Sequence, residues 1–176
     1  MNIFADAYPV DPPRLMPRLR HAVAGLGALL DESMLCLAPH PNSYRRFRAG
    51  ALAPSGRNWG YDHREVALRV PRSSEHNRRI EHRVAGADAN PYLVAAAVLS
   101  GALNGIEKEI RAPEPINGDS YSKSYDYIPL DWLSAIDIFK HGRLNKTFYS
   151  VSFIETACGG RTRRSAGWRD CKWPSP

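Results

Sequence analysis

The residues best suited to chemistry in this chain are arginines gathered in one segment. Residues 42–83 contain 10 Arg, no Lys and 4 acidic residues, a formal charge of +6, whereas the rest of the 176-residue chain holds 14 basic and 14 acidic side chains. Guanidinium groups bind phosphate and carboxylate oxygens through a planar pair of hydrogen bonds that lysine cannot reproduce. This composition indicates a site for an anionic ligand.

Two stretches of the segment, residues 65–70 and 79–84, alternate apolar and polar side chains with the period of half-buried β-strands. Residues 71–78 between them are typical of a hairpin connection. The alternation in residues 79–84 places His82 on the apolar side of its strand, as a core or interface histidine. The opposite face would carry four charged side chains together: Arg69, Arg79, Glu81 and Arg83.

Two interpretations fit a carboxylate flanked by arginines. Many such strands carry ion pairs that only solvate a surface. In the functional interpretation, Glu81 holds a divalent cation while guanidinium groups hold phosphate oxygens, the arrangement that phosphoryl transfer needs. One Glu is not a metal site, so at least two more acidic or histidine ligands would have to converge. No Gly-rich phosphate loop of the Walker or dinucleotide type is present.

Other elements must hold the arginine-rich segment in place, and the pattern of the N-terminal third of the chain predicts some of them. Apolar residues at helical spacing predict an amphipathic helix over residues 17–31. The apolar run at residues 34–38 favours a short buried strand. Residues 39–64, rich in Pro and Gly, predict a long irregular connection of the kind that is often functional.

The C-terminal half predicts further helices. Asn90 followed by Pro91 is a helix start, because Asn caps free amides and Pro at the first helical position loses no hydrogen bond. We expect that helix over residues 91–110, with a surface of small residues that permits close backbone approach. A shorter helix is expected within residues 129–140. After Gly142 the apolar residues follow neither the helical nor the strand period, which predicts weak order or disorder in residues 150–176.

Composition excludes several classes of protein. With 43% hydrophobic and 24% charged residues, the chain is typical of one globular domain. No secretory signal or membrane-spanning stretch is visible, so we expect a cytoplasmic protein without a membrane partner. Three cysteines without ligand spacing argue against a disulfide framework or a zinc site. The arginine segment has few interleaved aromatics for base stacking and no recognised nucleic-acid motif, so no nucleic-acid partner is expected.

Five motifs, in their order and spacing over roughly residues 2–139, resemble the C-terminal part of the glutamine synthetase catalytic domain. They are residues 42–47 (NSYRRF), 58–64 (NWGYDHR), 66–71 (VALRVP), 79–83 (RIEHR) and 87–93 (ADANPYL). The resemblance implies an α+β fold, a partial glutamine synthetase catalytic domain whose antiparallel strands form an active-site face packed by helices. It assigns residues 1–148 to that domain and leaves residues 149–176 as an atypical, poorly ordered tail. The Trp59-Gly60 pair is more similar to the branch that ligates glutamate to amines or polyamines than to the main ammonia-using enzymes.

The resemblance also implies an activity in nitrogen metabolism. Glutamate's side-chain carboxylate would attack the γ-phosphate of ATP, and ammonia or an amine would displace phosphate from γ-glutamyl phosphate. ATP and Mg²⁺ or Mn²⁺ are the implied cofactors, and the intact family forms homo-oligomers. Position by position, the family assigns a catalytic role to Arg64, substrate binding to Arg46 and Arg83, nucleotide binding to Arg69 and Arg79, and metal ligation to Glu81.

Two departures from the family pattern change this expectation. Leu52 stands where ammonia-using members carry a flap glutamate, which favours an amine substrate. The family's other metal carboxylates lie upstream of what begins here at Met1, so only Glu81 of that set is present. We therefore expect the isolated chain to be inactive. The alternatives are a catalytically inactive remnant that keeps only nucleotide or anion binding and, less favoured, a basic nucleic-acid-binding module.

Overall fold

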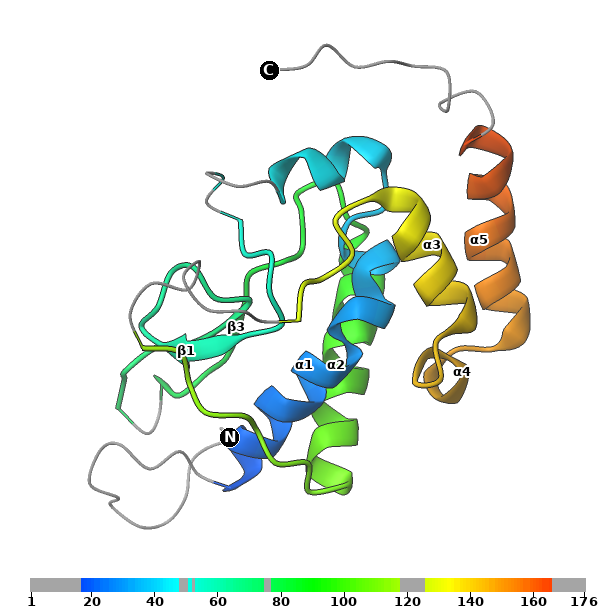
Figure 1. Cartoon of the computed structure of the whole chain (residues 1–176). Helices are drawn as coiled ribbons and strands as arrows, with labels where there is room; N and C mark the ends of the chain where they lie inside the picture. The colour runs from blue at the N-terminus through cyan, green and yellow to red at the C-terminus, as the bar shows by residue number, and fades with distance from the viewer. Residues whose placement is uncertain (1–16, 48–50, 52, 75–76, 118–125, 166–176) are drawn as a thin grey trace.

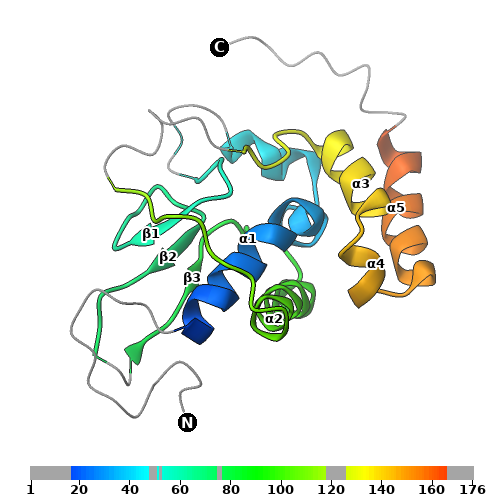
Figure 2. The same cartoon turned by 60° about the horizontal axis from the view of Figure 1, so that its bottom comes forward.

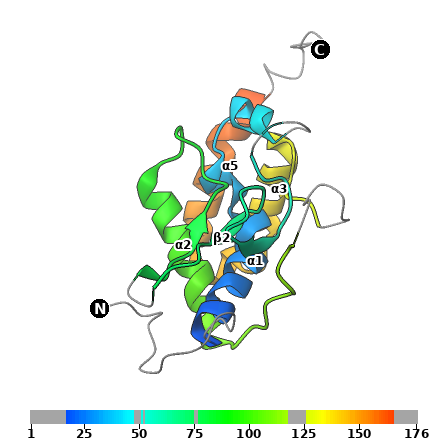
Figure 3. The same ribbon diagram turned by 90° about the vertical axis from the view of Figure 1, so that its left-hand side faces the viewer.

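Two helices form the middle of the molecule. The computed structural model describes residues 17–47, 51, 53–74, 77–117 and 126–165. The helices α1 (Pro17–Leu37) and α2 (Pro91–Glu107) pack along each other, between a small sheet and a group of three helices (Figures 1 and 2). From the side of the sheet, the strands lie in front of α1, with α3 and α5 behind it (Figure 3). The molecule is therefore layered, as expected for an α+β fold.

The helix α1 is longer than the sequence predicts, and the strand expected at residues 34–38 is wrong. The helix continues to Leu37, and residues 34–37 are all buried. A helix end that is buried on every side gives a continuous apolar run, which is also the pattern of a buried strand. A 3₁₀ helix, η1 (Pro41–Arg46), follows within the connection that was expected to be irregular.

Glycines bring the backbones of α1 and α2 into direct contact. A Cβ atom at Gly25 would lie 2.5 Å from Gly105 Cα and would overlap the carbonyl oxygen of Gly101. The predicted small-residue surface of α2 is thus confirmed. The predicted start of α2 is also confirmed, since the side chain of Asn90 accepts a hydrogen bond of 2.9 Å from the backbone N–H of Tyr92.

The sheet has three short strands in the order β1 (Trp59–Tyr61), β2 (Leu68–Val70) and β3 (Glu81–His82). The predicted antiparallel pairing of the two alternating stretches is confirmed, with Arg69 opposite Glu81. β1 was not predicted; it pairs parallel with β2 across the connection formed by residues 62–67. Asn58 secures this pairing, because its buried side chain accepts a 2.9 Å hydrogen bond from Ala67 N–H.

Three helices complete the chain: α3 (Trp132–His141), α4 (Asn145–Phe148) and α5 (Val151–Ser165). The expected α3 is confirmed, but α5 forms where weak order was expected, and residues 166–176 lie outside the described part. Ile154 and Cys158 of α5 are buried against α3. Phe153 and Ala157 pack against the core beside them, so the apolar face recurs at helical spacing. This face spans only two turns, and residues 159–165 add no apolar side chain, so the periodic signal in the sequence is short. In the described residues, no helix is both long and apolar enough to cross a membrane.

Alanine at Gly25 should destabilise the protein, because its methyl group would overlap the backbone of α2. Overpacking of this kind costs about 1–3 kcal/mol. Gly27 lies on the same helix with open space at its Cβ position, so Gly27→Ala is a matched control that should be neutral or stabilising by up to about 1 kcal/mol. Urea unfolding followed by circular dichroism measures both. Equal unfolding free energies for the two variants would contradict the close packing.

Candidate active site

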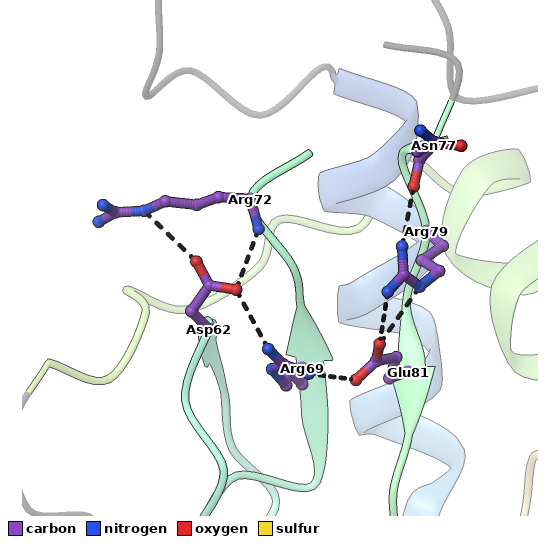
Figure 4. A network of polar contacts seen from close by, with 6 residues as sticks. All are labelled: Asp62, Arg69, Arg72, Asn77, Arg79 and Glu81. Atoms are coloured by element: carbon purple, nitrogen blue, oxygen red, sulfur yellow. Dashed lines mark hydrogen bonds and ion pairs between the residues drawn. The ribbon is translucent and has the colours of Figure 1, made fainter. Parts of the chain in front are cut away.

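The sheet brings three of the predicted site residues into contact. Arg69 Nη1 donates a hydrogen bond of 2.8 Å to Glu81 Oε2 across the antiparallel pair (Figure 4). Arg79 approaches from the other side, and its Nε and Nη2 lie 3.2 and 2.9 Å from Glu81 Oε1. One carboxylate therefore binds two guanidinium groups, one with each of its oxygens.

This arrangement determines the charge of Glu81. Burial of the partly exposed side chain raises its pKa, but hydrogen bonds from Arg69 and Arg79 and their positive charges outweigh burial and hold the pKa below its ordinary value. The carboxylate is therefore ionised at neutral pH. Arg79 is the more accessible of the two cations, with 54% of its side chain exposed against 24% for Arg69.

Asp62, which the sequence did not single out as a site residue, extends the network. Its Oδ1 lies 3.3 Å from Arg69 Nη2 and accepts a 3.1 Å hydrogen bond from the backbone N–H of Arg72 (Figure 4). Asp62 directly follows β1, whose parallel register with β2 places it beside Arg69. Since β1 has no alternating pattern of its own, only the structure shows this neighbour.

The remaining predicted residues have other partners. Arg46 donates from Nη2 to the carbonyl oxygen of Val84, and partial burial lowers its pKa. Arg83 Nη1 lies 3.5 Å from the carbonyl oxygen of Val66. Arg64 is exposed in the turn that leads to β2. Within the described residues, no hydrogen bond or ion pair joins these three arginines to Glu81.

The described residues alone do not fit a divalent metal. No group of three His, Cys, Asp or Glu side chains in the described part could hold an ion. Both oxygens of Glu81, the predicted metal ligand, are already bound by guanidinium groups. Because Mg²⁺ needs several oxygen ligands, Glu81 would serve as a ligand only together with groups from outside this part of the chain.

Comparison with known proteins decides the family. Residues 1–162 match the family described as glutamine synthetase, catalytic domain. The chain belongs to the glutamine synthetase family. A solved structure of ligand-free GmaS has the same fold, with a TM-score of 0.82 at 22% sequence identity over 98% of this chain and 39% of that one. The expected fold, a partial glutamine synthetase catalytic domain, is thereby confirmed.

Several relatives in this family are named as amine ligases. The chain is 42% identical to gamma-glutamylputrescine synthetase of Escherichia coli, over 78% of this chain and 28% of that protein. It is 38% identical to gamma-glutamylethanolamide synthetase of Streptomyces coelicolor, over 77% and 29%, and 33% identical to glutamate–isopropylamine ligase of a Pseudomonas species, over 87% and 34%. These names agree with the amine-ligating branch that the motifs resemble. The chain spans about three-tenths of the length of these relatives.

His82 follows Glu81 on β3, and its side chain lies on the opposite face of the sheet from the charged network. It pairs with the buried Leu68, on the apolar side of β3 that the sequence predicted. Its ring Nδ1 is buried and has no hydrogen-bond partner among the described residues. Burial lowers its pKa to about 4 from 6.5, so the ring is neutral at pH 7.

His82 should make the protein sensitive to acid. The unfolded chain takes up a proton on this ring near pH 6.5, whereas the folded protein does so only near pH 4, so stability falls as the pH drops through this window. Between pH 7.5 and 5.0 the loss should be about 2 kcal/mol. His82→Phe, which removes the titrating ring, should lose less over the same interval. Urea unfolding at the two pH values measures this, and an equal loss in both proteins would contradict it.

Proposed function

We propose that this chain, together with metal ligands from outside the described residues, acts as an ATP-dependent ligase that joins an amine to the side-chain carboxylate of glutamate. The carboxylate would attack the γ-phosphate of ATP, and the amine would then displace phosphate from γ-glutamyl phosphate. The observation that supports this proposal most directly is the pair of arginines, Arg69 and Arg79, held on one face of the sheet by Glu81. The amine ligases among its relatives support the choice of an amine over ammonia.

Each charged residue has a proposed task. The guanidinium groups that Glu81 orients would receive the phosphates of ATP, because planar arginine groups bind phosphate oxygens in pairs. Glu81 would also contact Mg²⁺ or Mn²⁺ once further ligands are supplied; the metal would neutralise the phosphates. The other three arginines would act on the reacting groups: Arg64 on the transferring phosphoryl group, and Arg46 and Arg83 on glutamate. We also propose a cytoplasmic homo-oligomer as the working form.

The ion pairs that Arg69 and Arg79 make with Glu81 determine how ATP would bind. A phosphate must compete with Glu81 for both arginines, since each guanidinium group already has a carboxylate partner. Arg79, the more exposed one, would be reached first. Phosphate binding should therefore weaken steeply as salt concentration rises, because exposed charges are screened within about 8 Å at physiological ionic strength.

The chain alone should show no amine-dependent ADP release with Mg²⁺ or Mn²⁺. Glu81 is a single carboxylate, and the described residues contain no metal-binding group around it. A coupled assay with glutamate and a panel of amines measures this, with gamma-glutamylputrescine synthetase of Escherichia coli as the positive control. Turnover that disappears in Glu81→Ala would contradict the prediction. It would also exclude the alternative of a catalytically inactive remnant.

Nucleotide binding should nevertheless be measurable, and it should depend on the two arginines. Replacing either Arg69 or Arg79 by Gln should weaken ATP binding about three- to tenfold, as expected for the loss of one partly exposed charged contact. Arg111→Gln removes an exposed arginine that follows α2 and has no part in the described Arg69–Glu81–Arg79 network, and it is the matched control. Isothermal titration calorimetry distinguishes the variants. Heats with ATP equal to those of buffer alone would count against the proposed site.

A further inference from the structure

Asp62 is fixed in place independently of the residues that it faces. Its backbone adopts a left-handed conformation, with φ of 49°, which Asp tolerates better than most residues. Its backbone N–H donates a 3.2 Å hydrogen bond to the carbonyl oxygen of Val70, and its carboxylate accepts from the backbone N–H of Arg72. The backbone and the side chain of Asp62 are thus both hydrogen-bonded to residues at, or just after, the end of β2. Neither of these hydrogen bonds involves Arg69 or Glu81.

Arg69 lies between two carboxylates: that of Asp62, which a backbone N–H also holds, and that of Glu81. Its Nη1 bonds to Glu81 at 2.8 Å, and its Nη2 faces Asp62 at 3.3 Å, so opposite sides of one guanidinium group are occupied (Figure 4). Glu81 is also bound to Arg79 and is a group that other ligands would engage. Asp62 has only backbone and arginine partners among the described residues.

We propose that Asp62 is a positioning residue for Arg69. It holds the guanidinium group on the charged face of the sheet when Glu81 turns to another partner, so that Arg69 need not be reoriented during binding. Three arginines share two carboxylates here: Arg69, Arg72 and Arg79 with Asp62 and Glu81. The network therefore keeps one positive charge in excess, which favours an anionic ligand even while every guanidinium group is oriented.

The rotation of the Arg69 guanidinium group tests this directly. In the full chain labelled with ¹⁵N-arginine, NMR measures the rate of rotation about the Nε–Cζ bond, which exchanges Nη1 with Nη2. Glu81→Gln alone should leave rotation slow, because Asp62 still holds Nη2. Combining it with Asp62→Asn should speed rotation about three- to tenfold beyond Glu81→Gln. If Glu81→Gln alone rotates as fast as the double variant, Asp62 does not position Arg69 and the proposal fails.

Two further variants separate positioning from folding. Asp62→Asn retains an oxygen for the Arg72 N–H, and Asp62→Gly accepts the left-handed backbone without strain. Both should have the same effect on Arg69 in the Glu81→Gln background. Asp126→Asn is the matched control, since it removes a carboxylate from Arg57 instead. A change in Arg69 rotation caused equally by Asp126→Asn would show a general charge effect and overturn the proposal.

A nucleotide titration connects this inference to the proposed function, on which only this part of the test rests. Asp62→Asn should weaken ATP binding about threefold in the chain that keeps Arg69 and have no effect in the Arg69→Gln background. The same change in both backgrounds would mean that Asp62 acts through its own charge and would contradict positioning. If no variant binds ATP, the proposed function fails, while the rotation rates still decide the role of Asp62.

Discussion

The direct backbone contact between α1 and α2 determines where the charged face can be. Gly25 and Gly105 leave no room for a side chain between the helices, so the separation of the two axes is fixed by backbone atoms. α1 then carries the sheet, because Leu68 and Val84 belong to the same buried core as α1. A hydrogen bond of 2.9 Å from Gly86 N–H to the carbonyl oxygen of Leu37 ties the chain after β3 to the end of α1. The position of β3, and with it Glu81, follows from this scaffold.

Charge compensation is the second organising feature. The arginine-rich segment carries a formal charge of +6 in the sequence, but on the charged face of the sheet the structure pairs its cations with carboxylates. Glu81 and Asp62 orient three arginines without cancelling their charge fully. Ion pairs this exposed contribute little to stability. Their value lies in orientation, since long arginine side chains lose conformational freedom before a ligand arrives.

The sequence was informative wherever a local rule decides the structure. Alternation placed Arg69 and Glu81 on one face, because strand pairing keeps the period of two, and the Asn90-Pro91 pair marked the start of α2. Features set by tertiary packing were not visible. The end of α1 looked like a strand because it is buried on all sides. α5 gave too short a signal because its apolar residues span only two turns. The partnership of Asp62 depends on the register of two strands, which no local pattern encodes.

The parallel pairing of β1 with β2 imposes a limit on length. Residues 62–67 connect the ends of two strands whose register sets Gly60 opposite Arg69. Parallel neighbours usually need a long crossover, so this short return has little slack. Surface loops generally tolerate insertions and deletions, but here a shift of one residue in β2 would turn Arg69 into the apolar core and bring Leu68 to the solvent. We therefore expect the connection formed by residues 62–67 to have the same length in relatives that carry this charged face.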